Sequence, residues 1–275
     1  MKTSRFGLAS LIIGYVFLYT PLISLVMFSF NSSKQVIFWT GFSMKWYKAL
    51  FMNSEILNAT LTSLEIAAIT ATGATILGAI SAIIILKFKK FRGKNLFEVL
   101  VSLPLIMPEV IMGLGLLLLF FNLESWFGWP RIGTKSAITF AHTTLSISYV
   151  CAIVHAQLVS FDETLLEAAM DLGARPIKAF FQIMIPFLMP SLISGWFLSF
   201  VLSMDDLIVA SFVGGPEATT LPMLIYSSVK FGVTPQINAL ASLIILFVMS
   251  ILTIGYFFHM RQKKSLEAIT SSPSQ

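Results

Sequence analysis

Long apolar runs without charge dominate the chain and predict its secondary structure. Five runs contain no Asp, Glu, Lys or Arg: 6–33, 66–86, 136–161, 179–204 and 231–260. A sixth apolar segment, 96–121, is interrupted only by Glu98 and Glu109. The hydrocarbon core of a bilayer needs about 20 apolar residues for each spanning helix. The pattern therefore predicts an all-α membrane protein with six transmembrane helices.

The predicted helices divide the chain into three parts. We place the helices at 8–29, 58–86, 96–121, 136–158, 188–213 and 236–259. The parts are then a first helix with its outer loop over 1–57, a five-helix core over 58–260 and a polar cytoplasmic tail over 261–275.

Prolines and short polar segments add detail to this division. Pro104 and Pro108 predict a kink in the third helix, because proline removes a helical hydrogen bond. The freed carbonyls then need protein or cavity water. The segment 218–235 is too short and too polar to span, which predicts an interfacial or re-entrant helix on the outer side.

Composition and charge agree with this prediction and set its orientation. The 275 residues are 56% hydrophobic and 11% charged, whereas about a quarter of a soluble domain is charged. With six spans, both termini share one side of the membrane. That side holds twelve of the 18 Lys and Arg residues: Lys2, Arg5, Lys87, Lys89, Lys90, Arg92, Lys94, Arg175, Lys178, Arg261, Lys263 and Lys264. The excess predicts that both termini are cytoplasmic, and topology explains the net charge of +5 without nucleic acid.

Sequence signatures of catalysis and of metal binding are absent. Cys151 is the single cysteine, so we expect a small packed apolar residue there rather than a disulfide, zinc or redox site. The chain contains no GxxxxGK[ST] loop for ATP, and HExxH and GxSxG are also missing. We therefore expect no enzyme activity, no metal and no cofactor bound by this chain.

One water-facing stretch, LLEAAMDLGARPIKAFFQIMIP, lies between the fourth and fifth predicted helices. Ser160 and Glu163 have the spacing of a capping box, which predicts a helix start. Gly173 suits a left-handed C-cap, and Pro176 suits the first turn of a second helix. We expect Pro186 to end that second helix before the fifth transmembrane helix begins. The stretch thus predicts a cytoplasmic helix–turn–helix.

The same stretch resembles the EAA motif of permease subunits in type I binding-protein-dependent ABC importers. That motif is EAA, then Gly, then an apolar stretch ending in I-x-L-P; Ile185 stands here where Leu is commoner. In that family the element is a coupling helix that docks in a cleft of a cytoplasmic ATPase subunit. The resemblance implies a set of ATPase-coupling residues: Glu167, Ala168, Ala169, Asp171, Leu172, Gly173 and Pro186.

Further segments resemble the permeases of spermidine and putrescine importers: FNSSK, GFSMKWY, LSMDDLIVASFVGGP and LPMLIYSSVKFGVTPQINALASL. The ATTLPM segment favours putrescine. The resemblance implies a multi-pass subunit of the bacterial inner membrane that imports a polyamine by alternating access. Its implied partners are a sister permease in a heterodimer, two cytoplasmic ATPase subunits that bind the ATP, and an extracytoplasmic polyamine-binding protein. The alternatives are an ABC permease for another small solute and a stand-alone secondary transporter or channel.

Carboxylates inside membrane segments identify the candidate cargo pathway. Such groups are costly to insert, so they face a cavity or a partner. Glu109, Asp205 and Asp206 are the candidates, and they suit a cargo with two or three positive charges. Trp196 and Tyr226 are candidates for cation–π contacts with that cargo. The structural alternative is that the carboxylates only hold the fifth helix in place.

Neighbouring polar residues are given smaller roles. Residues 205 and 206 are about 100° apart on a helix, so we expect one to face the pathway and the other to cap or pair with a neighbouring helix. Ser199 and Ser203 are expected to hydrogen-bond to the backbone and pack between helices. For His142 and His155 we expect a packing or hydrogen-bonding role.

Overall fold

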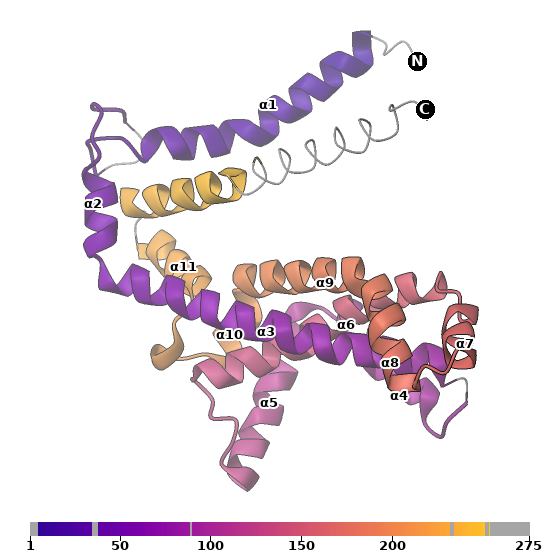
Figure 1. Cartoon of the computed structure of the whole chain (residues 1–275). Coiled ribbons are helices and arrows are strands. Elements are labelled where there is room, and N and C mark those ends of the chain that lie inside the picture. Colours follow the sequence, from indigo (N-terminus) through magenta and orange to yellow (C-terminus); the bar gives the residue numbers. More distant parts are fainter. Residues whose placement is uncertain (1–4, 35–37, 89, 232–233, 251–252, 254–275) are drawn as a thin grey trace, which may run out of the picture. The chain divides into compact units, whose positions relative to one another are not determined.

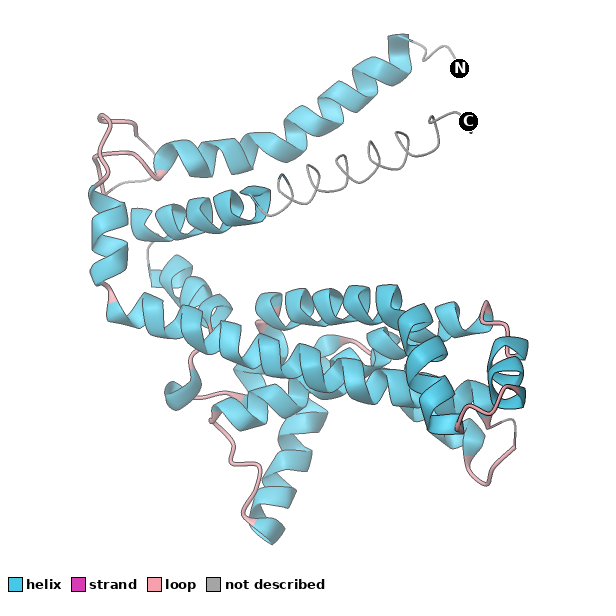
Figure 2. Ribbon diagram, viewed as in Figure 1, coloured by secondary structure: helices cyan, strands magenta, loops and turns pink. Residues whose placement is uncertain are grey.

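The computed structural model describes residues 5–34, 38–88, 90–231, 234–250 and 253. Over these residues the chain is helical, and its only β-pairing is in isolated bridges (Figure 2). The chain forms two compact units, each of which is described by itself. Unit 1 comprises Met1–Ser54 and Ser227–Gln275, and unit 2 comprises Glu55–Tyr226. The all-helical prediction is confirmed.

Unit 1 contains the first long helix and a loop organised by one asparagine. The helix α1 is Arg5–Phe28, and a short helix that was not predicted, α2, is Lys45–Met52. Asn31 is fully buried: its Oδ1 accepts the Thr40 amide at 3.0 Å, and its Nδ2 donates to the Phe38 carbonyl at 2.6 Å. Trp46 Nε1 donates to the Asn31 carbonyl at 2.7 Å, which ties α2 to the loop.

Unit 2 is built around the central helix α6, Lys135–Val159 (Figure 1). The other long helices are α3 (Ser54–Lys87), α5 (Glu109–Phe127) and α9 (Ile185–Asp205); the shorter ones are α4 (Lys94–Ser102), α7 (Thr164–Asp171), α8 (Pro176–Ala179), α10 (Ile208–Val213) and α11 (Leu221–Phe231).

Glycines let the helices of unit 2 approach closely. Val150 of α6 faces Gly78 of α3 and Gly195 of α9. A Cβ at these glycines would lie only 2.7 Å and 3.2 Å from Val150 atoms. Small residues allow such contacts between helix backbones where lipid gives no hydrophobic drive.

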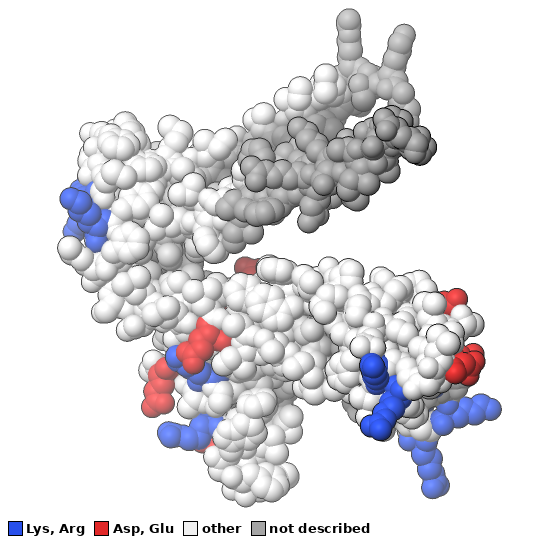
Figure 3. Space-filling view, viewed as in Figure 1, with Lys and Arg blue, Asp and Glu red and all other residues white. Residues whose placement is uncertain are grey.

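Five helices are long and apolar enough to cross a membrane among the described residues: Gly7–Phe28, Ser54–Lys87, Glu109–Phe127, Lys135–Val159 and Pro176–Asp205. The sixth predicted helix is present as the shorter apolar helix Pro235–Ser250, and most of its remaining length lies outside the described residues. The predicted tail over 261–275 also lies outside them. In unit 2 the charged side chains gather toward its ends, with a largely uncharged surface between them (Figure 3).

The prediction of one kinked third helix is wrong, because two prolines divide it. Helix α4 ends at Ser102 and is followed by the 3₁₀ turn Leu103–Leu105. Pro108 then has an extended backbone, with ψ of 136°, and α5 begins at Glu109. Leu103, before Pro104, keeps helical angles, with φ of −55° and ψ of −45°, and Pro104 lies in the 3₁₀ turn. The backbone leaves the helical conformation at Pro108.

The bounds of the fifth predicted helix are also wrong, at both ends. Pro186 does not end the preceding helix: α8 continues through a π-helical turn, Phe180–Met184, into α9, and Pro186 lies in the first turn of α9. At the other end, α9 stops at Asp205 and Asp206 is extended, with ψ of 115°. The separate helix α10 follows.

Candidate functional site

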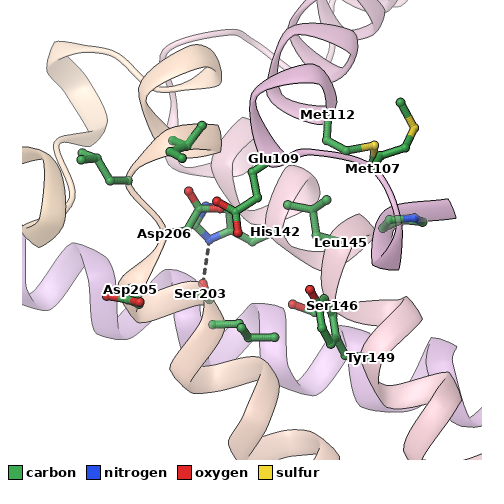
Figure 4. A pocket seen from close by; sticks show the side chains of 14 residues that line it. Met107, Glu109, Met112, His142, Leu145, Ser146, Tyr149, Ser203, Asp205 and Asp206 are labelled. Carbon is green, nitrogen blue, oxygen red and sulfur yellow. Dashed lines mark hydrogen bonds and ion pairs between the residues drawn. The ribbon is translucent and has the colours of Figure 1, made fainter. Parts of the chain in front are cut away.

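Two helix breaks meet at one pocket of unit 2. The pocket has a volume of about 320 Å³ and lies between the start of α5, the middle of α6 and the α9–α10 break (Figure 4). Ligand pockets usually range from about 300 to 1,000 Å³, so this one suits a small ligand. Its lining comprises Pro104, Met107, Glu109, Met112, His142, Leu145, Ser146, Tyr149, Leu202, Ser203, Asp205, Asp206, Leu207 and Ile208. Among these described residues there are three carboxylates and no Lys or Arg.

Asp206 shapes the break and points a carboxylate oxygen into the pocket. Its Oδ1 accepts the amide of Val209 at 2.9 Å and that of Ala210 at 3.4 Å, which caps α10. This is the hydrogen bonding typical of an Asp before a helix. The side chain is only 12% exposed, and Oδ2 lies 3.5 Å from Nε2 of His142. The cap therefore fixes one oxygen and leaves the other beside the imidazole.

His142 connects α6 to the end of α9. Its Nδ1 lies 2.7 Å from the hydroxyl of Ser203, and its side chain is 1% exposed. Nε2 is buried without a hydrogen-bond partner among the described residues. The expectation that Ser203 bonds to the backbone is wrong, because its hydroxyl meets the imidazole instead.

Glu109 and Asp205 add two exposed carboxylates to the same pocket. Glu109 is the first residue of α5, directly after the Pro108 break, and Asp205 is the last residue of α9. In Figure 4 Glu109 and Asp206 point toward the ring of His142, whereas Asp205 points to one side. The structure thus brings the three carboxylates that were predicted for the cargo pathway to one pocket, all of them at helix breaks.

The two predicted aromatic residues lie outside the pocket lining. Trp196 stacks on Phe200 at 5.4 Å between ring centroids and donates from Nε1 to Thr72 Oγ1 at 3.1 Å. Tyr226, on α11, is 60% exposed. The aromatic residue that lines the pocket is Tyr149, which the sequence analysis missed. Its position about two turns after His142 on the same face of α6 is the signal that identifies it, once His142 is placed in the site.

The α7–α8 element is folded as a helix–turn–helix with a different cap from the predicted one. Asp162, not Ser160, begins it: Asp162 Oδ1 accepts the Thr164 amide at 3.0 Å and the Thr164 hydroxyl at 2.7 Å. These hydrogen bonds from Thr164 lower the pKa of the Asp162 carboxyl. The Ser160 hydroxyl instead donates back to the Gln157 carbonyl at 2.7 Å. Gly173 closes α7 with φ of +86°, which confirms the predicted left-handed C-cap.

Part of the α7–α8 element packs on the rest of unit 2, and other side chains of the element are exposed. Phe161, Leu166 and Phe180 pack against a buried cluster that includes Met184 and Leu188. Five other apolar side chains of the element are exposed, and we call them the apolar ridge: Leu165, Met170, Leu172, Ile177 and Phe181. Leu172 is 90% exposed and Ile177 is 74% exposed. Glu167 and Asp171 are also exposed on this element.

Sequence comparisons relate the chain to transport proteins. Residues 74–267 match the family described as "Binding-protein-dependent transport system inner membrane component". The putrescine transport system permease protein PotI of Escherichia coli K12 is 50% identical over 242 residues, which cover 88% of this chain and 86% of that protein. The spermidine/putrescine transport system permease protein PotC of the same strain is 41% identical over 231 residues, covering 84% and 85%.

A solved structure shares the fold. It is a bacterial ABC transporter involved in the import of the acidic polysaccharide alginate, with a TM-score of 0.66, 19% identity and 93% coverage of both chains. At this identity the likeness concerns the fold alone.

Proposed function

The chain belongs to the family of binding-protein-dependent transport system inner membrane components and is a permease subunit of an ABC importer. From this premise we propose that its cargo is a polyamine. We propose putrescine first and spermidine second, because the putrescine permease PotI is 50% identical and the spermidine/putrescine permease PotC is 41% identical. The observation that carries the proposal is the pocket with Glu109, Asp205 and Asp206 in its lining and no basic residue.

The pocket suits the chemistry of a polyamine cation. Each ammonium group loses water when it enters a membrane protein, and carboxylate oxygens replace that water. Hydrogen bonds to charged groups contribute about 1.5 to 3 kcal/mol each, which is enough to attract the cargo and weak enough to release it. The apolar part of the lining, which includes Met112 and Leu145, suits the methylene chain between two ammonium groups.

The energy for transport reaches the chain through the α7–α8 element in this proposal. An exposed apolar ridge beside carboxylates is typical of a helical surface that docks in a groove of a partner. We propose that the partner is a cytoplasmic ATPase subunit, which binds the ATP. A sister permease completes the pathway as a heterodimer, a polyamine-binding protein delivers the cargo, and both termini lie in the cytoplasm.

The test is ATP-driven uptake by the complete importer in proteoliposomes, with radiolabelled putrescine and spermidine. Glu109→Gln keeps the size of the side chain and removes its charge. We expect its uptake to fall by about tenfold, which corresponds to the loss of one charge-assisted interaction. Glu124→Gln is the matched control on the same helix: Glu124 accepts the Ile132 amide through Oε2 at 3.0 Å, and a glutamine oxygen can also accept it.

The two results test the identity of the cargo and the role of the pocket separately. Uptake of putrescine and of spermidine that is no greater than without ATP would contradict the polyamine proposal. Equal uptake by Glu109→Gln and by Glu124→Gln, at equal assembly, would contradict the role of the pocket alone. The identity of the preferred polyamine follows from the ratio of the two uptake rates.

A further inference from the structure

The Nε2 atom of His142 faces the pocket without a hydrogen-bond partner among the described residues. The side chain is 1% exposed and lines the pocket. A buried polar atom without a partner costs free energy, so such an atom in a native structure calls for an occupant. The atom facing Nε2 is Asp206 Oδ2, at 3.5 Å.

The two neighbouring contacts restrict what can lie between these atoms. Asp206 cannot turn away without losing its cap on α10, because Oδ1 accepts the amides of Val209 and Ala210. The imidazole cannot turn away without losing Ser203, 2.7 Å from Nδ1. When Nδ1–H donates to that hydroxyl, Nε2 of the neutral ring is an acceptor. Two acceptors then face each other, and a proton or a hydrogen-donating cation is needed between them.

We propose that the position within hydrogen-bonding distance of both His142 Nε2 and Asp206 Oδ2 is a cation site, which holds a proton shared by the pair when the pocket is empty and a primary ammonium group of the cargo when it is filled. This rests on the proposed function, since it deepens the role of the same pocket. A hydrogen-bonded N···O or N···N distance of about 2.9 Å allows one ammonium nitrogen to reach both acceptors. An ammonium group has three N–H donors, so a third remains for another oxygen of the pocket.

The exchange conserves charge and protons. With one proton on either His142 or Asp206, the pair has no net charge. When the ammonium group enters, it hydrogen-bonds to both atoms, and that proton leaves to the water of the pocket. The pair has then become one neutral imidazole and one carboxylate, with the ammonium charge in place of the proton charge.

The other titratable residues of the pocket lining come from three elements: Asp205 from the end of α9, Glu109 from the start of α5 and Tyr149 from α6. The two carboxylates favour any cation at the site, a proton or an ammonium group alike. Acidification therefore opposes cargo binding by competition.

The first experiment measures the KM for putrescine in proteoliposomes of the complete importer as the outer pH is lowered. In the wild type we expect KM to rise by up to about tenfold per pH unit below the pH at which the His142–Asp206 pair is half-protonated. The reason is that one proton competes with one ammonium group. In His142→Gln we expect this rise to disappear. The Kd of the binding protein for putrescine is measured separately at each pH. In both cases KM is divided by the change in that Kd.

His155→Gln is the matched control, because His155 lies on the same helix and outside the pocket lining. It should keep the wild-type rise of KM. A rise in His142→Gln that equals the rise in His155→Gln overturns the proposal, while uptake itself remains and the proposed function stands.

A second experiment needs no variant. Putrescine is added to the purified wild-type importer in a lightly buffered solution with a pH indicator, and bound putrescine is measured by equilibrium dialysis. Below the pH at which the His142–Asp206 pair is half-protonated, we expect up to one proton to be released per putrescine bound. Well above that pH we expect none. Binding without proton release at every pH overturns the inference alone. Absence of putrescine binding at every pH contradicts the proposed function of the pocket, and the inference with it.

Discussion

The pocket and the α7–α8 element both combine carboxylates with apolar side chains, but they present them in opposite ways. In the pocket, His142 is buried and Asp206 is 12% exposed, and both are held by defined contacts to Val209, Ala210 and Ser203. On the α7–α8 element, Glu167 is exposed and Leu172 is 90% exposed. The first region has its polar groups oriented before any ligand arrives. The second leaves apolar side chains exposed on its surface.

This difference indicates what each region requires. A preoriented polar pocket needs only a small cation, whereas an exposed apolar ridge is a surface suited to a macromolecular partner. Changes at the ridge should therefore alter coupling to ATP and leave cargo binding intact. Changes in the pocket should alter cargo binding and leave ATPase docking intact.

The largest effect is expected from Glu167→Lys on the α7–α8 element. A charge reversal in a docked interface places like charges opposite each other, which typically costs several kcal/mol. We expect ATP-driven uptake of putrescine to fall by about 100-fold in proteoliposomes, with putrescine binding to the detergent-solubilised complex unchanged.

The control for that variant is Glu163→Lys, the same charge change one turn earlier in an exposed position. It should retain more than about a third of the uptake, as surface charges usually contribute little. A Glu167→Lys importer with wild-type ATP-driven uptake would contradict the docking role of this element.

The next effect in size is expected from Asp206→Asn in the pocket. The amide oxygen can still cap α10, but the charge opposite His142 is lost. We expect uptake to fall by about 30-fold, within the range of one charge-assisted hydrogen bond. ATPase subunits should still co-purify with the variant in wild-type amounts. A loss of co-purification would show that the two regions are not separable.

A smaller effect is expected from Leu172→Ser on the apolar ridge. Burial of a leucine side chain against a partner contributes about 1.5 to 3 kcal/mol. We expect the affinity for the ATPase subunit to fall by about tenfold in a pull-down titration, without a change in thermal stability of the permease alone, because the side chain is exposed there. Val159→Ser, at an apolar position with 64% exposure outside the ridge, should leave the affinity unchanged.

The positions of the long helices could be predicted from sequence because their apolar runs exceed the length that a bilayer requires. The helices α1, α3 and α6 lie within a few residues of the predicted ranges. Gly173 was also predictable, because its positive φ is a local property of one residue type.

The breaks were harder to predict, because proline has opposite effects at different helix positions. At Pro108 the helix is broken, but at Pro186 it continues from the π-helical turn Phe180–Met184 into α9. The break at Asp206 contains no proline: it depends on the aspartate accepting two amides of α10. His142 and Ser203 could not be paired from sequence, since 61 residues separate them and only the packing of α6 on α9 brings them together.

The smallest effect is expected from the aromatic residues and compares two tyrosines. Tyr226→Phe removes a hydroxyl from an exposed side chain outside the pocket, whereas Tyr149→Phe removes one from the pocket lining. We expect uptake by Tyr226→Phe to stay within about twofold of the wild type, as for most surface substitutions. Uptake by Tyr149→Phe should fall by about threefold, through the loss of a neutral hydrogen bond near the cation. If Tyr226→Phe has the larger effect, the cargo contacts α11 rather than the pocket between α5, α6 and the α9–α10 break.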